Sequence, residues 1–207
     1  MNARYYAIFT KIGKNIIRND TRIYYTDETP KKEKGRCLGV VIAKYPGLAF
    51  PKNFDEWTEL ELGEDNMLSN IKGLFENTFE RIKFLPKVND YIRILNLINI
   101  RMPDNLTMVG KNIDLYIEKA ENDLEKAPLI FIGWSDGVEL NPYREIWINI
   151  LRSYESKCLY VTYKIYRKYK IAYGIPNIGK KVRHPQGMPH QIVLDNIEGI
   201  LKKFLSN

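Results

Sequence analysis

The chain has 207 residues, of which 44% are hydrophobic and 28% are charged. This length fits one α/β domain better than two, and the apolar share is sufficient for one sizeable core. The formal net charge of +7 favours a polyanionic partner over an acidic or neutral one. A solvated, Lys-rich surface would give the same charge balance.

Several protein classes are disfavoured by missing signals. The two cysteines, Cys37 and Cys158, lie far apart and form no CxxC pair, which argues against a zinc site or a disulfide framework. No stretch approaches the roughly 20 apolar residues of a membrane span, and the first residues contain no export signal. A P-loop and a Gly-x-Ser-x-Gly elbow are both missing. We expect a cytoplasmic protein with reduced, buried thiols and no membrane partner.

The first predicted elements are strands. Alternation of apolar and polar residues predicts two short strands, over 4–13 and 21–28, which form an N-terminal hairpin within residues 1–36. A continuous apolar run over 37–47 breaks at Pro46-Gly47 and predicts a central strand covered on both faces. Residues 48–65 are expected to form a loop that carries several aromatic side chains.

Helices and buried strands then alternate along the chain. Apolar residues at helical spacing predict helices over 66–85, 112–127, 141–154 and 191–205, the first of them capped by Asp65 or Asn66. Apolar runs between the helices predict buried strands over 90–101, 128–137 and 157–163. This order predicts one three-layer α/β/α domain, residues 1–207, with a mainly parallel four-stranded sheet and a core within 38–194.

In such sheets, ligands bind where the parallel strands end. This rule selects one segment after each of the four predicted core strands: 45–47, 99–101, 134–137 and the stretch that contains His184. We therefore expect these segments to be neighbours in space.

Four motifs in this order resemble those of the uracil-DNA glycosylase superfamily: VVIAKYPG, RILNLINIR, LIFIGWSDG and RHPQGMPH. A closer likeness is to an uncharacterised bacterial and phage family with a Leu-Asn-Pro-Ser-Thr-Ala loop, an Asn-Leu strand, a Trp-Gly turn and an Arg-His-Pro stretch. The motifs span residues 38–194, most of the chain. The resemblance implies a three-layer fold that binds a nucleobase or nucleic acid at the strand ends, without a cofactor.

The resemblance also implies roles for single residues. Asn96 or Asn99 would read a base edge, and His184 would stabilise the departing base. Tyr45 stands where those enzymes place the residue that positions the attacking water, and a tyrosine cannot act as a carboxylate base. Asp136 would have to substitute. The chain is thus expected either to cleave an N-glycosidic bond or to be a non-catalytic binding module.

Both histidines of the chain lie in one stretch, KKVRHPQGMPHQIVL. An imidazole at a strand end can donate to an oxyanion, and Arg183, Lys180 and Lys181 would favour anions beside His184. The alternative is a purely structural role, in which His184-Pro185 only shapes a turn. His190 is expected to mark the entry to the last helix, and no third ligand suggests a metal.

The remaining candidates have both a functional and a structural interpretation. Asn96 and Asn99, at odd separation on one strand, are expected on opposite faces, where an amide could read a base or bond the backbone. The loop after the third core strand offers Trp134, Ser135 and Asp136. Asp136 could be a base or a turn cap. The first loop offers Pro46 and Gly47 beside two aromatic residues that could stack on a base or pack together, Tyr45 and Phe50.

A Tyr/Lys-rich insertion over 163–180 is the clearest electrostatic feature. Cations neutralise phosphates and aromatic rings stack on bases, so this mixture suits nucleic acid. A Tyr-rich hairpin with solvated lysines would look the same. The basic residues assigned to nucleic acid here are Lys164, Arg167, Lys168 and Lys170, together with Lys180 and Lys181.

Overall fold

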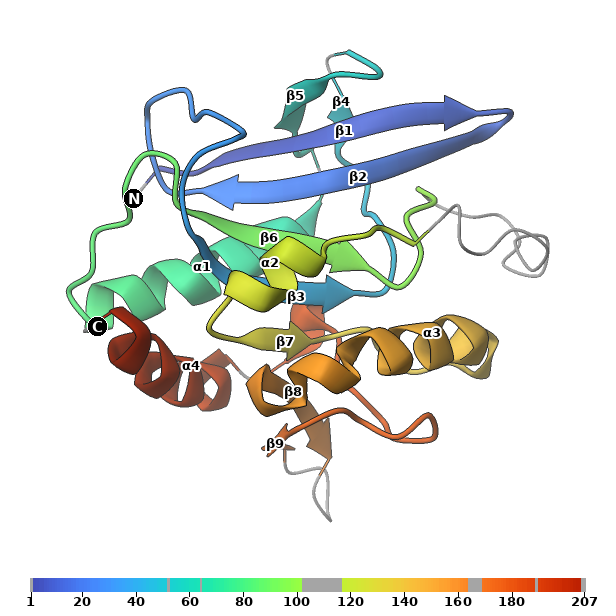
Figure 1. Ribbon diagram of the computed structural model, residues 1–207, viewed down its shortest axis with the longest axis vertical. Helices are drawn as coiled ribbons and strands as arrows, with labels where there is room; N and C mark the ends of the chain where they lie inside the picture. Colours follow the sequence, from blue (N-terminus) through green and yellow to red (C-terminus); the bar gives the residue numbers. More distant parts are fainter. Residues whose placement is uncertain are drawn as a thin grey trace.

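The chain folds into one mixed β-sheet with helices on both faces (Figure 1). The computed structural model describes residues 2–51, 53–63, 65–101, 117–163, 169–188 and 190–205. The sheet has nine strands in the order β4-β5-β1-β2-β6-β3-β7-β8-β9. The α/β class predicted from the sequence is therefore confirmed, and the sheet is larger than the four strands expected.

The four inner strands are parallel and the outer ones are antiparallel. β6 pairs with β3, β3 with β7 and β7 with β8 in parallel register, so their carboxyl ends lie at one edge of the sheet. These strands are Tyr91–Asn96 (β6), Cys37–Ala43 (β3), Ile130–Ile132 (β7) and Cys158–Tyr163 (β8). Nearly every residue of the four is buried, because helices cover both faces.

The N-terminal hairpin is an integral part of this sheet. Its strands, Arg4–Ile12 (β1) and Asn15–Tyr24 (β2), pair with each other, and β2 continues the sheet by pairing antiparallel with β6. The segment predicted as a loop adds two further strands, Phe50–Pro51 (β4) and Trp57–Glu61 (β5). β5 pairs with β1, and the Trp57 ring stacks on Tyr6 with ring centroids 4.2 Å apart. At the other edge, Tyr169–Tyr173 (β9) pairs antiparallel with β8.

Each face of the sheet has its own hydrophobic core. Helices Asn66–Arg81 (α1) and His190–Leu205 (α4) pack on one face, and Glu121–Lys126 (α2) and Asn141–Leu151 (α3) pack on the other. Three short 3₁₀ helices complete the described elements: Val138–Leu140 (η3), Arg152–Lys157 (η4) and Pro185–Gly187 (η6). α4 begins at His190, as predicted, and α2 is shorter than predicted within the described residues.

Buried polar groups join the elements on the α2 face. Arg93, in the middle of β6, is almost fully buried and forms ion pairs with Asp20, Glu118 and Asp123. Burial raises the pKa of Glu118, whereas the arginines keep the pKa of Asp20 low despite its burial. This cluster connects β2, β6 and α2.

Both cysteines are free and buried, as predicted. Burial raises the pKa of Cys37 and of Cys158 to about 12, so neither thiol is ionised near neutral pH. Within the described part of the chain, no helix has the length and apolar character that crossing a membrane requires.

Candidate functional site

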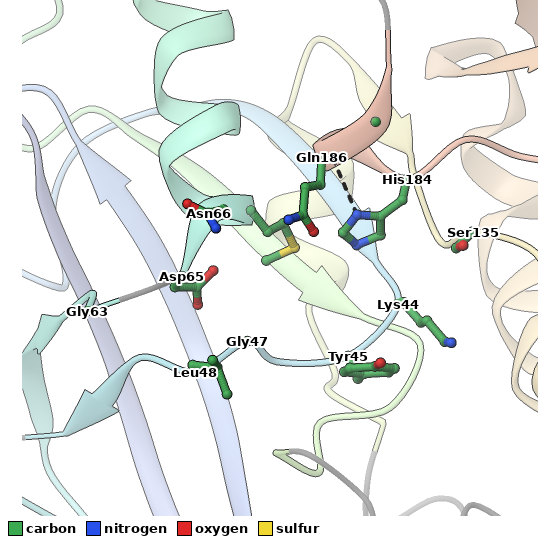
Figure 2. A pocket seen from close by; sticks show the side chains of 12 residues that line it. Lys44, Tyr45, Gly47, Leu48, Gly63, Asp65, Asn66, Ser135, His184 and Gln186 are labelled. Atoms are coloured by element: carbon green, nitrogen blue, oxygen red, sulfur yellow. Dashed lines mark hydrogen bonds between the residues drawn. The ribbon is translucent and has the colours of Figure 1, made fainter.

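A cavity of about 980 Å³ lies at the edge of the sheet where the inner strands end. Figure 2 shows its walls, which come from the loop after β3, the start of α1, Ser135 after β7 and the turn that carries His184. This is the edge that the ligand rule for parallel sheets selects.

Four residues that the sequence assigned to the site line this cavity: Tyr45, Gly47, Ser135 and His184. Pro46 is buried within the same loop as Tyr45 and Gly47. The segments after β3, β7 and β8 thus meet, as expected. The segment after β6 contributes no lining residue among those described.

His184 has a defined protonation state. Its Nδ1 accepts a hydrogen bond of 3.3 Å from the backbone N–H of Gln186, so the neutral ring has its proton on Nε2. Burial, together with the charges of Lys44 and Arg183, lowers the pKa of His184 to about 4 against the opposing effect of Asp65. The imidazole is therefore a neutral donor at neutral pH, on the wall of the cavity (Figure 2).

Asp65 is a site residue that the sequence pattern assigned only to helix capping. As the N-cap of α1, its Oδ1 accepts from the backbone N–H of Leu68 at 3.2 Å. Its Oδ2 forms an ion pair of 3.1 Å with the buried Arg18 of β2. The carboxylate lines the cavity and packs against the Cα of Gly47. The first loop therefore lies beside a carboxylate supplied by the next helix.

Asn96 and Asn99 are buried, and neither is among the described residues that line the cavity. The prediction that they point to opposite faces was wrong: β6 ends at Asn96, and the turn that follows brings the Asn96 Nδ2 within 3.5 Å of the Asn99 Oδ1. Asn99 also donates to the side chain of Asn19 on β2. Among the described residues, the amides that line the cavity are Asn66 and Gln186 instead.

The loop after β7 has three different environments. Trp134 is buried in the core on the α2 and α3 side. Ser135 has a φ of 66°, and its carbonyl accepts from Arg144 at 2.6 Å. Asp136 is exposed and its Oδ1 accepts from the backbone N–H of Val182 at 2.9 Å, outside the described lining of the cavity. Asp136 therefore connects this loop to the segment that leads to His184.

Arg183 faces the hairpin formed by β8 and β9. Its guanidinium donates to the Tyr163 hydroxyl at 2.6 Å and to the Gly187 carbonyl at 2.7 Å, and it lies over the rings of Tyr163 and Tyr169. Among the described lining residues, the cation is Lys44, whose Nζ is 4.9 Å from the centroid of the Tyr45 ring. No sequence signal distinguished Lys44 from other lysines.

The described basic residues of the Tyr/Lys-rich segment are solvent-exposed. Lys170 lies on β9, and Lys180 and Lys181 lie on the return toward His184. Lys164, Arg167 and Lys168 lie outside the described residues, as does the side chain of Phe50. Part of the predicted nucleic-acid surface is therefore exposed at the strand-end edge of the sheet.

No cluster of three or more His, Cys, Asp or Glu side chains suited to a metal ion occurs within the described ranges. Comparisons of the chain with models of protein families, with curated proteins and with solved structures found no match in any of the three.

Proposed function

We propose that the cavity at the strand ends binds a nucleobase of a nucleic acid and that the chain hydrolyses its N-glycosidic bond. The observation that supports this function is that one cavity is lined by two suitable groups. They are a neutral His184 with a proton on Nε2 and the carboxylate of Asp65. The first can donate to a leaving base, and the second can accept a proton from water.

The proposed reaction needs only these groups and one water molecule. Asp65 orients the water and accepts its proton while the water oxygen forms a bond to C1′ of the sugar. The bond from C1′ to the base nitrogen breaks, and its electron pair leaves with the base. The Nε2–H of His184 donates a hydrogen bond to the base and stabilises this charge. Transfer of the proton from Asp65 to the released base completes the balance. Tyr45 supplies an aromatic face for stacking.

The topology supports the same proposal. The parallel strands β6-β3-β7-β8, with helices on both faces, carry the four motifs that resemble the uracil-DNA glycosylase superfamily. In this chain Asp65, from the start of α1, would take the role that the resemblance assigns to the first loop, and Asp136 would not be needed.

A non-catalytic nucleic-acid-binding module is the competing function. The observation that favours it is the burial of Asp65, whose side chain is only 1% exposed and already caps α1 and pairs with Arg18. A carboxylate confined to these roles would leave the cavity as a binding site without a base.

An incision assay separates the two functions. Single- and double-stranded oligonucleotides that contain uracil, hypoxanthine or other altered bases are incubated with the wild-type chain, His184→Ala and Asp65→Asn. Release of a base by the wild type, and its reduction by about 10²-fold or more in each variant, is the expected result. Tight, salt-sensitive binding with no release of any base would instead establish the binding module.

A further inference from the structure

A buried arginine lies directly behind the cavity wall. Arg18, on β2, has 0% exposed surface, and its ion-pair partner is Asp65, with 3.1 Å between Nη1 and Oδ2. Its Nε and Nη2 are buried and have no hydrogen-bond partner among the described residues. The N-terminal hairpin therefore supplies a full positive charge to the first turn of α1.

This arrangement is unfavourable for stability alone. Removal of a guanidinium from water costs more than a single ion pair recovers, and apolar replacements of buried ion pairs are often as stable as the original. Burial accordingly lowers the pKa of Arg18, against the opposing attraction of Asp65. Stability therefore does not by itself explain a buried cation at this position, and its charge is directed at a neighbouring group.

The neighbouring group is the Asp65 carboxylate, which is held at each of its two oxygens. Oδ1 of Asp65 accepts from the backbone N–H of Leu68, and Oδ2 accepts from Arg18, while the carboxylate packs on Gly47. A carboxylate oxygen can accept more than one hydrogen bond, so acceptor capacity is left for a group in the cavity. Within the described part of the chain, Tyr5, Arg101 and His184 also interact electrostatically with Asp65.

We propose that Arg18 is a positioning residue that holds the Asp65 carboxylate in the orientation needed to accept a proton from water. This inference rests on the proposed hydrolysis of an N-glycosidic bond. The N-terminal hairpin is then a component of the site. β2 contributes no lining residue among those described, and it acts through the ion pair of its Arg18 with the lining residue Asp65.

The test compares Arg18→Met, Arg18→Lys, Asp65→Asn and the double variant Arg18→Met/Asp65→Asn under single-turnover conditions. Arg18→Met is expected to lower the maximal rate of base release about 10- to 100-fold, with little change in the substrate concentration that gives half of this rate. Arg18→Lys should recover part of the rate. In the Asp65→Asn background, Arg18→Met should have no further effect.

A matched control is Arg22→Met. Arg22 lies on the same strand as Arg18 but forms its ion pair with Asp20. This variant should leave the rate at its wild-type value. A folded Arg18→Met protein with the wild-type rate would overturn the role of Arg18 and leave the proposed hydrolysis intact.

A second measurement does not depend on turnover. The backbone amide signal of Gly47 in an NMR spectrum reports the position of the Asp65 carboxylate that packs against it. This signal is expected to shift in Arg18→Met and to stay in place in Arg22→Met. If the wild type releases no base while the signal shifts in Arg18→Met, hydrolysis is wrong and the positioning of Asp65 by Arg18 is supported. An unchanged signal in Arg18→Met overturns the positioning role.

Discussion

The carboxylate of Asp65 packs against the Cα of Gly47 so closely that Gly47 has no room for a side chain. A Cβ added to Gly47 would lie 2.7 Å from Oδ1 of Asp65 and closer still to Oδ2. The glycine after Pro46 thus allows the first loop to meet the start of α1. Tyr45 occupies the position where the resemblance expected a water-activating residue, and the nearest described carboxylate in the cavity lining comes from the helix instead.

Gly47→Ala is expected to reduce base release about 100-fold. The added methyl group must displace the Asp65 carboxylate, and displacement of a catalytic group by about 1 Å can cost this much. Single-turnover rates measure the effect. Gly179→Ala is the matched control, because nothing lies within 4 Å of a Cβ added at Gly179. Equal rates for the two variants would show that the position of Asp65 does not matter.

His184 makes stability depend on pH. Its pKa is about 4 in the folded chain and 6.5 in the reference state, because burial disfavours the imidazolium. Between these values the unfolded chain binds the proton and the folded chain does not, so the free energy of unfolding falls as pH decreases through this window. His184→Asn should remove this contribution. Urea denaturation of both proteins at pH values from about 4 to about 7 measures it, and parallel pH profiles would contradict it.

Arg93→Met is expected to lower the free energy of unfolding by about 3–5 kcal/mol, because it leaves buried carboxylates without their shared cation. Arg93 is 3% exposed and pairs with Asp20, Glu118 and Asp123. Chemical denaturation monitored by circular dichroism is the measurement. Arg81→Met removes an exposed pair with Asp195 and should cost about 0–1 kcal/mol. Equal losses of unfolding free energy in the two variants would show that the buried Arg93 cluster stabilises the fold no more than an exposed ion pair does.

Lys180→Ala/Lys181→Ala should weaken binding to single-stranded DNA and make it less dependent on salt. Each lysine that no longer neutralises a phosphate is expected to reduce the slope of log K against log salt by about 0.7. Titrations between about 50 and 200 mM salt measure the slope. Lys126→Ala/Lys203→Ala removes two exposed lysines near the start of β7 and the end of α4, away from the cavity. If this control changes the salt slope as much as Lys180→Ala/Lys181→Ala does, DNA binding depends on net charge rather than on a specific surface.

Local patterns were sufficient to predict most elements. The uniform apolar runs at β3, β6, β7 and β8 predicted buried strands, and helical spacing predicted α1, α3 and α4. β5 was missed because Thr58 and Leu60 are the buried residues of a strand too short to show a clear alternation. Its identity depends on pairing with β1, about fifty residues earlier in the sequence, which a local pattern does not contain.

Site residues were predictable where they follow a parallel strand directly. Tyr45, Gly47 and Ser135 do so, and they line the cavity. His184 also lines it, although β9 lies between the parallel strand β8 and His184. The same argument did not hold for Asn96 and Asn99. The chain turns after Asn96, and both amides lie in the interior. The basic neighbours of Arg183 predicted an anion site, yet its contacts with Tyr163 and Tyr169 are made across the β8–β9 hairpin.

The sequence by itself determined the α/β class, the alternation of buried strands and amphipathic helices, and the location of His184 at a strand end. Periodicity and strand order are properties of local segments, so they can be read without a structure. Only the tertiary structure decided that His184 is a neutral donor, that Asp65 lines the same cavity, and that Arg18 lies behind Asp65. Burial and charge pairing depend on residues far apart in sequence, so the stretch KKVRHPQGMPH could not reveal its partners on α1 and β2.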